Sequence, residues 1–172
     1  MCTQPLAQQY IGKFKEHLSQ VDESVLVILK GHLIIEELLD EILSRGVFHA
    51  QFVETASLRF AQKINLARSL SLREQDNEMW NVIVAVNALR NEMAHSLGSE
   101  KRKKKTQALL SLCIAYSKDS GLFENNKEQP EHVLLFWGCA FAFGFLTGLN
   151  EELKRFRSIV STLDAVMNKG NL

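Results

Sequence analysis

The sequence predicts an all-α protein, a helical bundle with long antiparallel helices and short connections. Apolar residues recur at steps of three and four along most of the chain, and alternating strand patterns are absent. The two prolines, Pro5 and Pro130, leave the long stretch between them without the residue that most strongly breaks helices. With 172 residues and no linker-like stretch, the chain is expected to form a single domain over residues 1–172.

Hydrophobic periodicity divides the chain into six helical segments. Asp22 belongs to the residue types that cap helix N-termini, and Gly46 to those that end helices, so the two bound the second segment. A loop is expected from Lys118 to Pro130, where Gly and Asn residues gather. The expected helices run from Leu6 to Leu18, Asp22 to Ser44, Ser57 to Leu72, Asp76 to Leu97, Thr106 to Ser117 and, as one helix or a helix pair, Glu131 to Asn168.

One segment, from Val133 to Leu149, carries no charge. It is somewhat shorter than the roughly 20 residues that a membrane-spanning helix needs. Ala140, Gly144 and Gly148 recur in it every four residues, a spacing that lets another helix approach closely. We predict a buried core or interface helix, and the alternative is a membrane helix.

The cysteines and the charge balance bound the class of protein. Cys2, Cys113 and Cys139 are widely spaced and form no C-x-x-C pair, so neither a disulfide framework nor a zinc site is indicated. The start of the sequence lacks the apolar run of a signal peptide, so the expected location is the cytoplasm. Because the formal net charge is zero, any binding of nucleic acid has to come from a local patch.

An arginine interrupts the apolar stripe of the fourth predicted helix. The stripe follows steps of three and four residues, and Arg90 falls on it. A guanidinium keeps its proton and is costly to bury unpaired, so Arg90 requires a partner, a water-filled cleft or a ligand. The apolar members of the stripe are Met79, Ile83, Val86, Met93 and Leu97.

Polar residues adjoin Arg90 along one edge of the same helix, namely Asn87, Asn91 and His95. Asn91 and His95 are one turn apart, so the amide is placed to orient the imidazole. A histidine can act as general acid or base near neutrality, and an arginine can bind a phosphate through two hydrogen bonds. These groups suit cleavage of RNA by attack of the 2′-hydroxyl on the adjacent phosphate, without a metal or a cofactor.

This chemistry needs a base at the nucleophile and an acid at the leaving group, but the helix offers one histidine. A two-fold homodimer supplies the second, so we predict a composite site. Glu36 or Glu37 is expected to pair with Arg90 or to orient His95, and Asn87 and Ser96 are expected to support the site. The alternative is structural: an ion pair fixes the arginine to an acidic residue of the second helix, and the histidine is a cation favourable to the helix C-terminus.

A basic run, Lys101-Arg102-Lys103-Lys104-Lys105, begins six residues after His95. We expect it to bind RNA phosphates at the mouth of the site, in a manner that weakens as salt rises. The alternative is a solvated loop without a binding role.

Two further patterns are given structural interpretations. His32, Glu36 and Asp40 recur every four residues, but only the histidine is a strong ligand type, and no metal site is expected. Aromatic side chains that could stack on bases lie within apolar segments and are expected in the core instead. They are Trp80, Phe136, Trp137, Phe141, Phe143 and Phe145.

The segment Arg90-Asn91-Glu92-Met93-Ala94-His95 resembles the signature of HEPN domains, an arginine followed after four to six residues by a histidine. The resemblance extends from about Val25 to Ser117, so the motif core lies at about 22–117 and the C-terminal apolar region at about 131–168. It implies a HEPN-like bundle, a homodimer and, in active members, a metal-independent ribonuclease of toxin–antitoxin, phage-defence or RNA-processing systems. Arg90 and His95 are the implied catalytic residues, Asn91 supports them, and a cognate antitoxin is an implied partner.

The sequence departs from one HEPN branch at one position and also resembles a second family. One HEPN branch carries a modified tyrosine two residues after the histidine, and Leu97 stands at that position here. The chain also resembles the mannitol-operon repressor family, which has a similar helix order and a related Leu-Arg-x-x-x-x-His stretch. That second resemblance implies the alternative function, a non-catalytic transcriptional regulator or interaction module.

Overall fold

The structure is a computed structural model, and it describes residues 22–95, 100–118, 123 and 128–168. Within these ranges it is all-α, with six helices and no strand, as the periodicity predicts. The helices are α2 (Glu23–Gly46), α3 (Ala50–Thr55), α4 (Phe60–Leu70), α5 (Met79–His95), α6 (Glu100–Tyr116) and α7 (Glu131–Met167).

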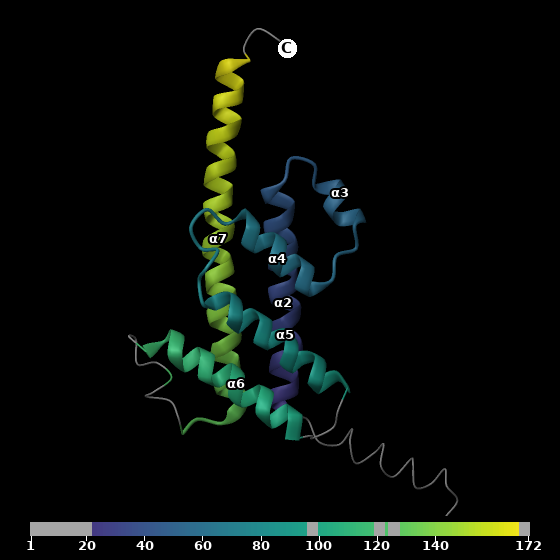
Figure 1. Cartoon of the computed structure of the whole chain (residues 1–172), viewed down its shortest axis with the longest axis vertical. Helices are drawn as coiled ribbons and strands as arrows, with labels where there is room; N and C mark the ends of the chain where they lie inside the picture. Colours follow the sequence, from purple (N-terminus) through teal and green to yellow (C-terminus); the bar gives the residue numbers. More distant parts are fainter. Residues whose placement is uncertain (1–21, 96–99, 119–122, 124–127, 169–172) are drawn as a thin grey trace, which may run out of the picture.

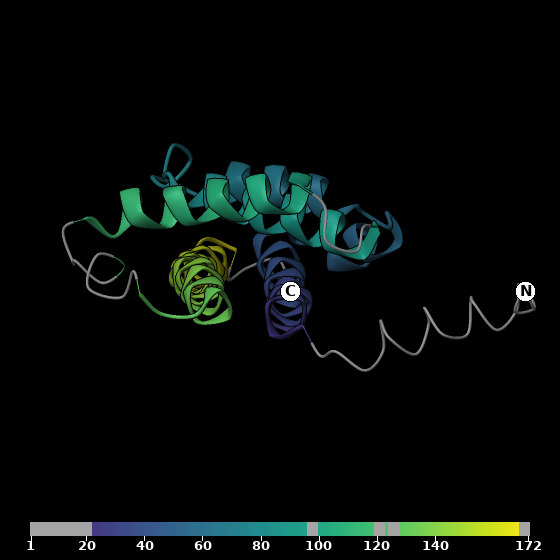
Figure 2. The same ribbon diagram turned by 90° about the horizontal axis from the view of Figure 1, so that it is seen from below.

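The helices form two layers. α2 and α7 lie side by side in one layer, and α4, α5 and α6 cross them on one face (Figures 1 and 2). α2 and α7 run parallel, because Glu23 binds His132 near their first turns and Arg157 reaches the carbonyl of Arg45 near the end of α2. The expectation of long antiparallel helices with short connections is therefore wrong for this pair. Parallel neighbours need a crossover, and α3 to α6 provide it.

The core lies where the crossing helices meet the α2–α7 pair. From α2, Ile28, Ile35 and Leu39 are fully buried, and from α7, Leu135 and Leu146 are. Close approach of the two helices depends on a glycine: a Cβ at Gly31 would lie 2.5 Å from the Sγ of Cys139. A side chain at this position would require Cys139 to shift.

The charge-free segment predicted from Val133 to Leu149 lies within α7. Its inward side chains are buried against α2, as expected of a core helix, but Phe136 and Phe143 are about half exposed and correct the expectation that all the aromatic residues are core. They face away from the α4–α6 layer, in an open groove shared with α2. By length and composition alone, α7 is also the one helix among those described that could cross a membrane.

Local signals placed several helix ends correctly. The side chain of Asp22 accepts a hydrogen bond from the backbone N–H of Val25 at 3.1 Å, which confirms the predicted N-cap of α2. α2 ends at Gly46, where a Cβ would collide with Leu70. α5 begins at Met79 rather than Asp76, because the side chain of Asn77 accepts the Met79 N–H at 2.8 Å.

Other boundaries differ from the prediction. α6 starts at Glu100, so the basic run is helical, and α7 is a single helix rather than a pair. The short helix α3 has no predicted counterpart. The expected helix from Leu6 to Leu18 lies outside the described residues.

Candidate functional site

The apolar stripe predicted on α5 is buried at Met79, Ile83, Val86 and Met93, while Leu97 lies outside the described residues. Arg90 is half-buried at the edge of this stripe, and its Nη1 donates to the side-chain oxygen of Asn91 at 3.2 Å. Among the described residues, no carboxylate forms an ion pair with Arg90. The interruption of the stripe is therefore not explained by a structural salt bridge.

Arg90 lines an open cleft of about 420 Å³ between α2, α4 and α5. A second guanidinium, that of Arg59, lines the same cleft, together with Phe60 and Ala61 from the first turn of α4. Backbone N–H groups in a first turn lack intrahelical partners and carry partial positive charge. One carboxylate, that of Glu36, also lines the cleft, but it is paired with Lys63. The two cations and the positive end of a helix therefore remain to favour an anion.

His32 forms part of the wall of this cleft and is almost fully buried. Its ring stacks on Phe60 with centroids 4.1 Å apart, and its Nε2 donates to the side-chain oxygen of Asn87 at 3.2 Å. Burial lowers the pKa of His32 despite the bond to Asn87 and the nearby Glu36, so the ring is neutral at neutral pH. Asn87 also lines the cleft, and its amide NH₂ is a group that can donate to a ligand there.

The acidic residues of α2 take other partners than those expected. Glu36 does not bind Arg90; it accepts from the Nζ of Lys63 at 2.9 Å, and Lys63 also binds Asp40 at 2.7 Å. Although burial opposes it, these two bonds raise the pKa of Lys63, which stays charged. Lys63 projects from α4 and contacts both carboxylates, so Glu36 is paired without Arg90. Glu37 is exposed elsewhere on α2.

His95 is the last residue of α5, exposed, and does not line the cleft. His95 follows one turn after Asn91, the last residue of α5 that lines the cleft, so it lies beyond the cleft at the end of the helix. The expected hydrogen bond between Asn91 and His95 is absent from the described residues, since the Asn91 oxygen binds Arg90. Ser96 lies outside them.

The basic run occupies the start of α6, and three of its members make ion pairs. Arg102 binds Asp22 at 2.5 Å and approaches Glu131 at 3.7 Å, and the bond to Arg102 lowers the pKa of Asp22. Lys103 binds Glu100 and Lys105 binds Glu92, at 3.1 and 3.0 Å. The run is therefore not a solvated loop, and its side chains point around a helix. Lys101 and Lys104 are exposed.

Sequence reasoning missed Arg59, Lys63 and the contact of His32 with Asn87. His32 and Asn87 are 55 residues apart, and no local spacing reports such a pair. The available signal for Arg59 was its place directly before an amphipathic helix, which puts a cation beside a helix N-terminus. For Lys63 the signal was the pair of acidic residues one turn apart on α2.

Comparison with known proteins adds no family assignment to this geometry. The chain matches no protein-family model, no curated protein and no solved structure.

Proposed function

We propose that the protein is a metal-independent endoribonuclease of the HEPN type, in which Arg90 binds the scissile phosphate and His95 transfers protons. The observation that carries this proposal is Arg90 itself, which lines an open cleft and has no carboxylate partner among the described residues. A buried or half-buried guanidinium in that position is most simply explained by an anionic ligand. Arg59 and the first turn of α4 extend the same positive surface.

The reaction needs two proton-transfer groups. A base removes the proton of the 2′-hydroxyl, whose oxygen forms a bond to phosphorus as the bond to the 5′-oxygen breaks, and an acid protonates that leaving oxygen. Arg90 stabilises the negative charge on the phosphoryl oxygens. Since His95 lies at the rim rather than in the cleft of its own chain, we propose that a homodimer brings His95 of one copy to the cleft of the other.

The proposal places the activity in the cytoplasm, as a toxin or a phage-defence enzyme restrained by a cognate antitoxin protein. Lys101 and Lys104 are the members of the basic run best placed to contact RNA, since both are exposed. The ion pairs of Arg102, Lys103 and Lys105 reduce the charge that the run can offer. RNA binding by this patch should therefore be weak and sensitive to salt.

The decisive experiment is cleavage of end-labelled RNA by the purified chain in EDTA. Arg90→Gln and His95→Ala should each abolish cleavage, and the matched controls Arg155→Gln and His49→Ala, at exposed positions outside the cleft, should not. The product should carry a 2′,3′-cyclic phosphate. RNA left uncut by the wild-type protein, or cut by Arg90→Gln and His95→Ala as well as by the wild type, would refute the proposal.

Arg59→Gln tests the cleft separately from the chemistry. It should weaken RNA binding several-fold while leaving the cyclic-phosphate product unchanged, because Arg59 lines the cleft but its guanidinium keeps its proton and cannot serve as acid or base. Unchanged binding would show that the phosphate does not enter this cleft.

A second candidate is a non-catalytic regulator or interaction module of the mannitol-operon repressor type. The specific observation in its favour is the exposed apolar surface on α7, because such surface marks sites where other molecules bind. This candidate predicts partner binding that survives His95→Ala, and RNA cleavage that depends on His95 would exclude it.

A further inference from the structure

The C-terminal part of α7 projects beyond the rest of the protein (Figure 1). Arg157 donates to the carbonyl oxygens of Ser44, Arg45 and Val47, so α2 ends beside Arg157. From there to Met167 the helix continues for about 15 Å at 1.5 Å per residue. We call residues 154–167 the α7 tip. All of them are exposed except Val160, which is half-buried.

The tip continues an apolar repeat that begins in the core. Apolar residues alternate at steps of three and four along α7, the heptad pattern by which helices pair in coiled coils. The first three members, Leu146, Leu149 and Leu153, are buried. The pattern then runs without a break onto the bare tip through Phe156, Val160, Leu163 and Met167.

The exposure on the tip is large for such residues. Leu163 is 54% and Met167 81% exposed, and Ile159 and Val166 widen the stripe on one side. A continuous apolar stripe of this kind on a helix marks a surface that another molecule covers. Because the same repeat already packs a helix within the chain, a helix is the occupant that its geometry fits.

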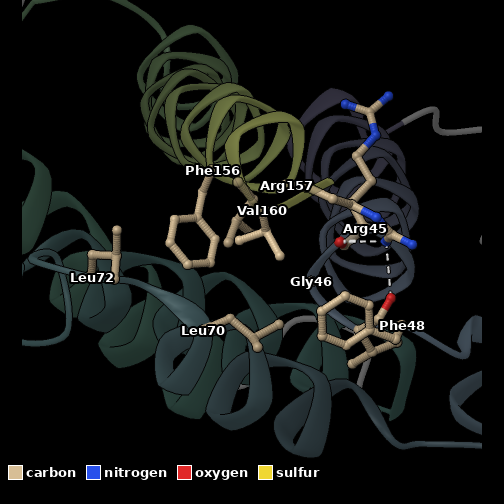
Figure 3. Close-up of a pocket in the computed structure, with 10 residues that line it drawn as sticks. Arg45, Gly46, Phe48, Leu70, Leu72, Phe156, Arg157 and Val160 are labelled. Carbon is tan, nitrogen blue, oxygen red and sulfur yellow. Dashed lines mark hydrogen bonds between the residues drawn. The ribbon is translucent and has the colours of Figure 1, made fainter. Parts of the chain in front are cut away.

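An apolar crevice lies at the base of the tip (Figure 3). Phe156 and Val160 of the tip face Leu70 and Leu72 across it, and Phe48 closes one side (Figure 3). The crevice has a volume of about 120 Å³, suited to one inserted side chain, and Phe48 is 76% exposed at its edge.

We propose that two copies of the chain associate through their α7 tips, aligned antiparallel about a two-fold axis, so that Met167 of each copy covers the crevice of the other. In this alignment Phe156 lies opposite Met167 of the partner and Val160 opposite its Leu163, and symmetry repeats both layers. Methionine is flexible and unbranched, which suits it to fill an irregular crevice. One interface thus covers the stripe and the crevice together.

Charge favours the antiparallel direction. Within the tip, Lys154, Arg155 and Arg157 lie near the base and Asp164 lies near the end. Antiparallel pairing brings Asp164 near the end of one tip close to the cations at the base of the other tip. Arg157 and Asp164 lie on the same flank of the apolar stripe, so Asp164 of one copy can approach Arg157 of the other. Parallel pairing would instead set the three cations of one copy beside those of the other.

This contact is separate from the one required by the proposed ribonuclease site. The tip and the C-terminal end of α5 lie toward opposite ends of the molecule (Figure 1). Pairing of the tips therefore leaves the Arg90 cleft open, and its test does not depend on cleavage of RNA.

The first test is the mass of the full chain in solution, measured by light scattering on a sizing column. We expect at least twice the 19.5 kDa of the chain, depending on whether the separate ribonuclease contact also forms. Leu163→Glu should halve the mass of the wild-type assembly with unchanged helical circular dichroism, and the matched control Ala165→Glu, on the opposite side of the tip, should keep the wild-type mass. A monomeric wild type, or a mass that Leu163→Glu leaves unchanged, would overturn the proposal.

The second test reads the direction of pairing. Phe156→Cys and Met167→Cys proteins, each also carrying Cys2→Ser, are mixed and treated with a short bismaleimide. Antiparallel tips give a cross-linked product containing one chain of each variant, whereas parallel tips cross-link each variant to itself. The remaining native thiols, Cys113 and Cys139, are buried and should not react.

The third test asks whether a lipid surface, rather than a second copy, covers the apolar stripe of the α7 tip. Wild-type protein is floated with vesicles of phosphatidylcholine and phosphatidylglycerol. We expect the dimer to stay in the soluble fraction. A monomer that floats with vesicles and is released by Leu163→Glu would overturn the proposal and assign the stripe to a membrane.

Discussion

The two parts of α7 carry the same repeat and differ in what covers them. Residues 135–153, the inner segment, pack their apolar side chains against α2 and the crossing helices, while the α7 tip leaves the corresponding side chains in water. A heptad pattern therefore indicates which side of a helix is apolar, but it does not indicate how far along the helix another helix of the same chain covers that side. The difference in burial should appear directly as a difference in energetic response to the same substitution.

The largest contrast is expected between Leu146→Ala and Leu163→Ala. Leu146 is fully buried, so its truncation should lower the free energy of unfolding by about 2–5 kcal/mol. Leu163 lies on the bare tip, and its truncation should change that free energy by about 0.5 kcal/mol or less. Urea denaturation of each variant, at a protein concentration where the chain is monomeric, provides the measurement. Equal losses would show that the tip is packed within the monomer.

Two glycines give the next contrast: Gly31 of α2, which faces the inner segment, and Gly144, which lies within that segment. Gly31→Ala should destabilise the protein by about 1–3 kcal/mol, because the new Cβ would lie 2.5 Å from the Sγ of Cys139. Gly144→Ala should stabilise it by roughly 0.5–1 kcal/mol, since a Cβ there meets nothing within 4 Å and alanine favours the helix. Thermal denaturation distinguishes the two directions.

A double variant checks the cause assigned to Gly31. Replacing the opposing side chain as well, in Gly31→Ala with Cys139→Ala, should recover part of the loss. A loss that persists in full would place the strain elsewhere than between α2 and α7.

Arg157 stands where the inner segment gives way to the tip. Its Nη1 is directed at three carbonyl oxygens at the end of α2, where a cation also opposes the negative end of the helix dipole. Arg157→Met should therefore cost about 1 kcal/mol of stability. The matched Arg155→Met variant should be nearly neutral in the same denaturation experiment, and a neutral Arg157→Met would show that solvent replaces these bonds without loss.

The last contrast concerns the reactivity of cysteine thiols in the two parts of α7, and it involves the smallest change in stability. Burial raises the pKa of Cys139 to about 12, so at pH 8 it holds on the order of 1000-fold less reactive thiolate than an ordinary cysteine. A cysteine on the tip, Ser158→Cys, should react with a maleimide at the normal rate in a Cys2→Ser background. Rapid labelling of Cys139 in the folded protein would contradict its burial.

Sequence patterns predicted the features that depend on near neighbours. The helical class, the cap at Asp22, the end at Gly46 and the buried stripe of α5 follow from residues within one or two turns. What the patterns missed depends on residues brought together by the fold. Arg102 binds Asp22 from 80 residues away, and it lies in the first turn of α6, where a loop was expected.

The candidate site divides in the same way. Arg90 could be found from the sequence because it interrupts the apolar pattern of its own helix. The cleft could not, because part of its lining comes from α4, and residue spacing on α5 does not indicate which helix packs beside it. The expectation that Glu36 pairs with Arg90 was wrong. Glu36 binds Lys63, which is 27 residues away in the sequence, so no local spacing indicates this contact. The catalytic roles of Arg90 and His95 remain predictions.

The parallel pairing of α2 and α7 also governs when the protein can fold. Arg45 and Arg157, which meet at the end of this pair, are separated by 112 residues of chain. Since domains form as their segments leave the ribosome, α4 and α5 can pack on α2 early, but the apolar side chains of α2 that contact α7 stay uncovered until α7 has been synthesised. Contacts between such distant segments also slow folding, because a long loop has to close before they form. Shortening the chain from the α7 side should therefore produce an aggregation-prone nascent species, and dependence on chaperones should concentrate in that interval of synthesis.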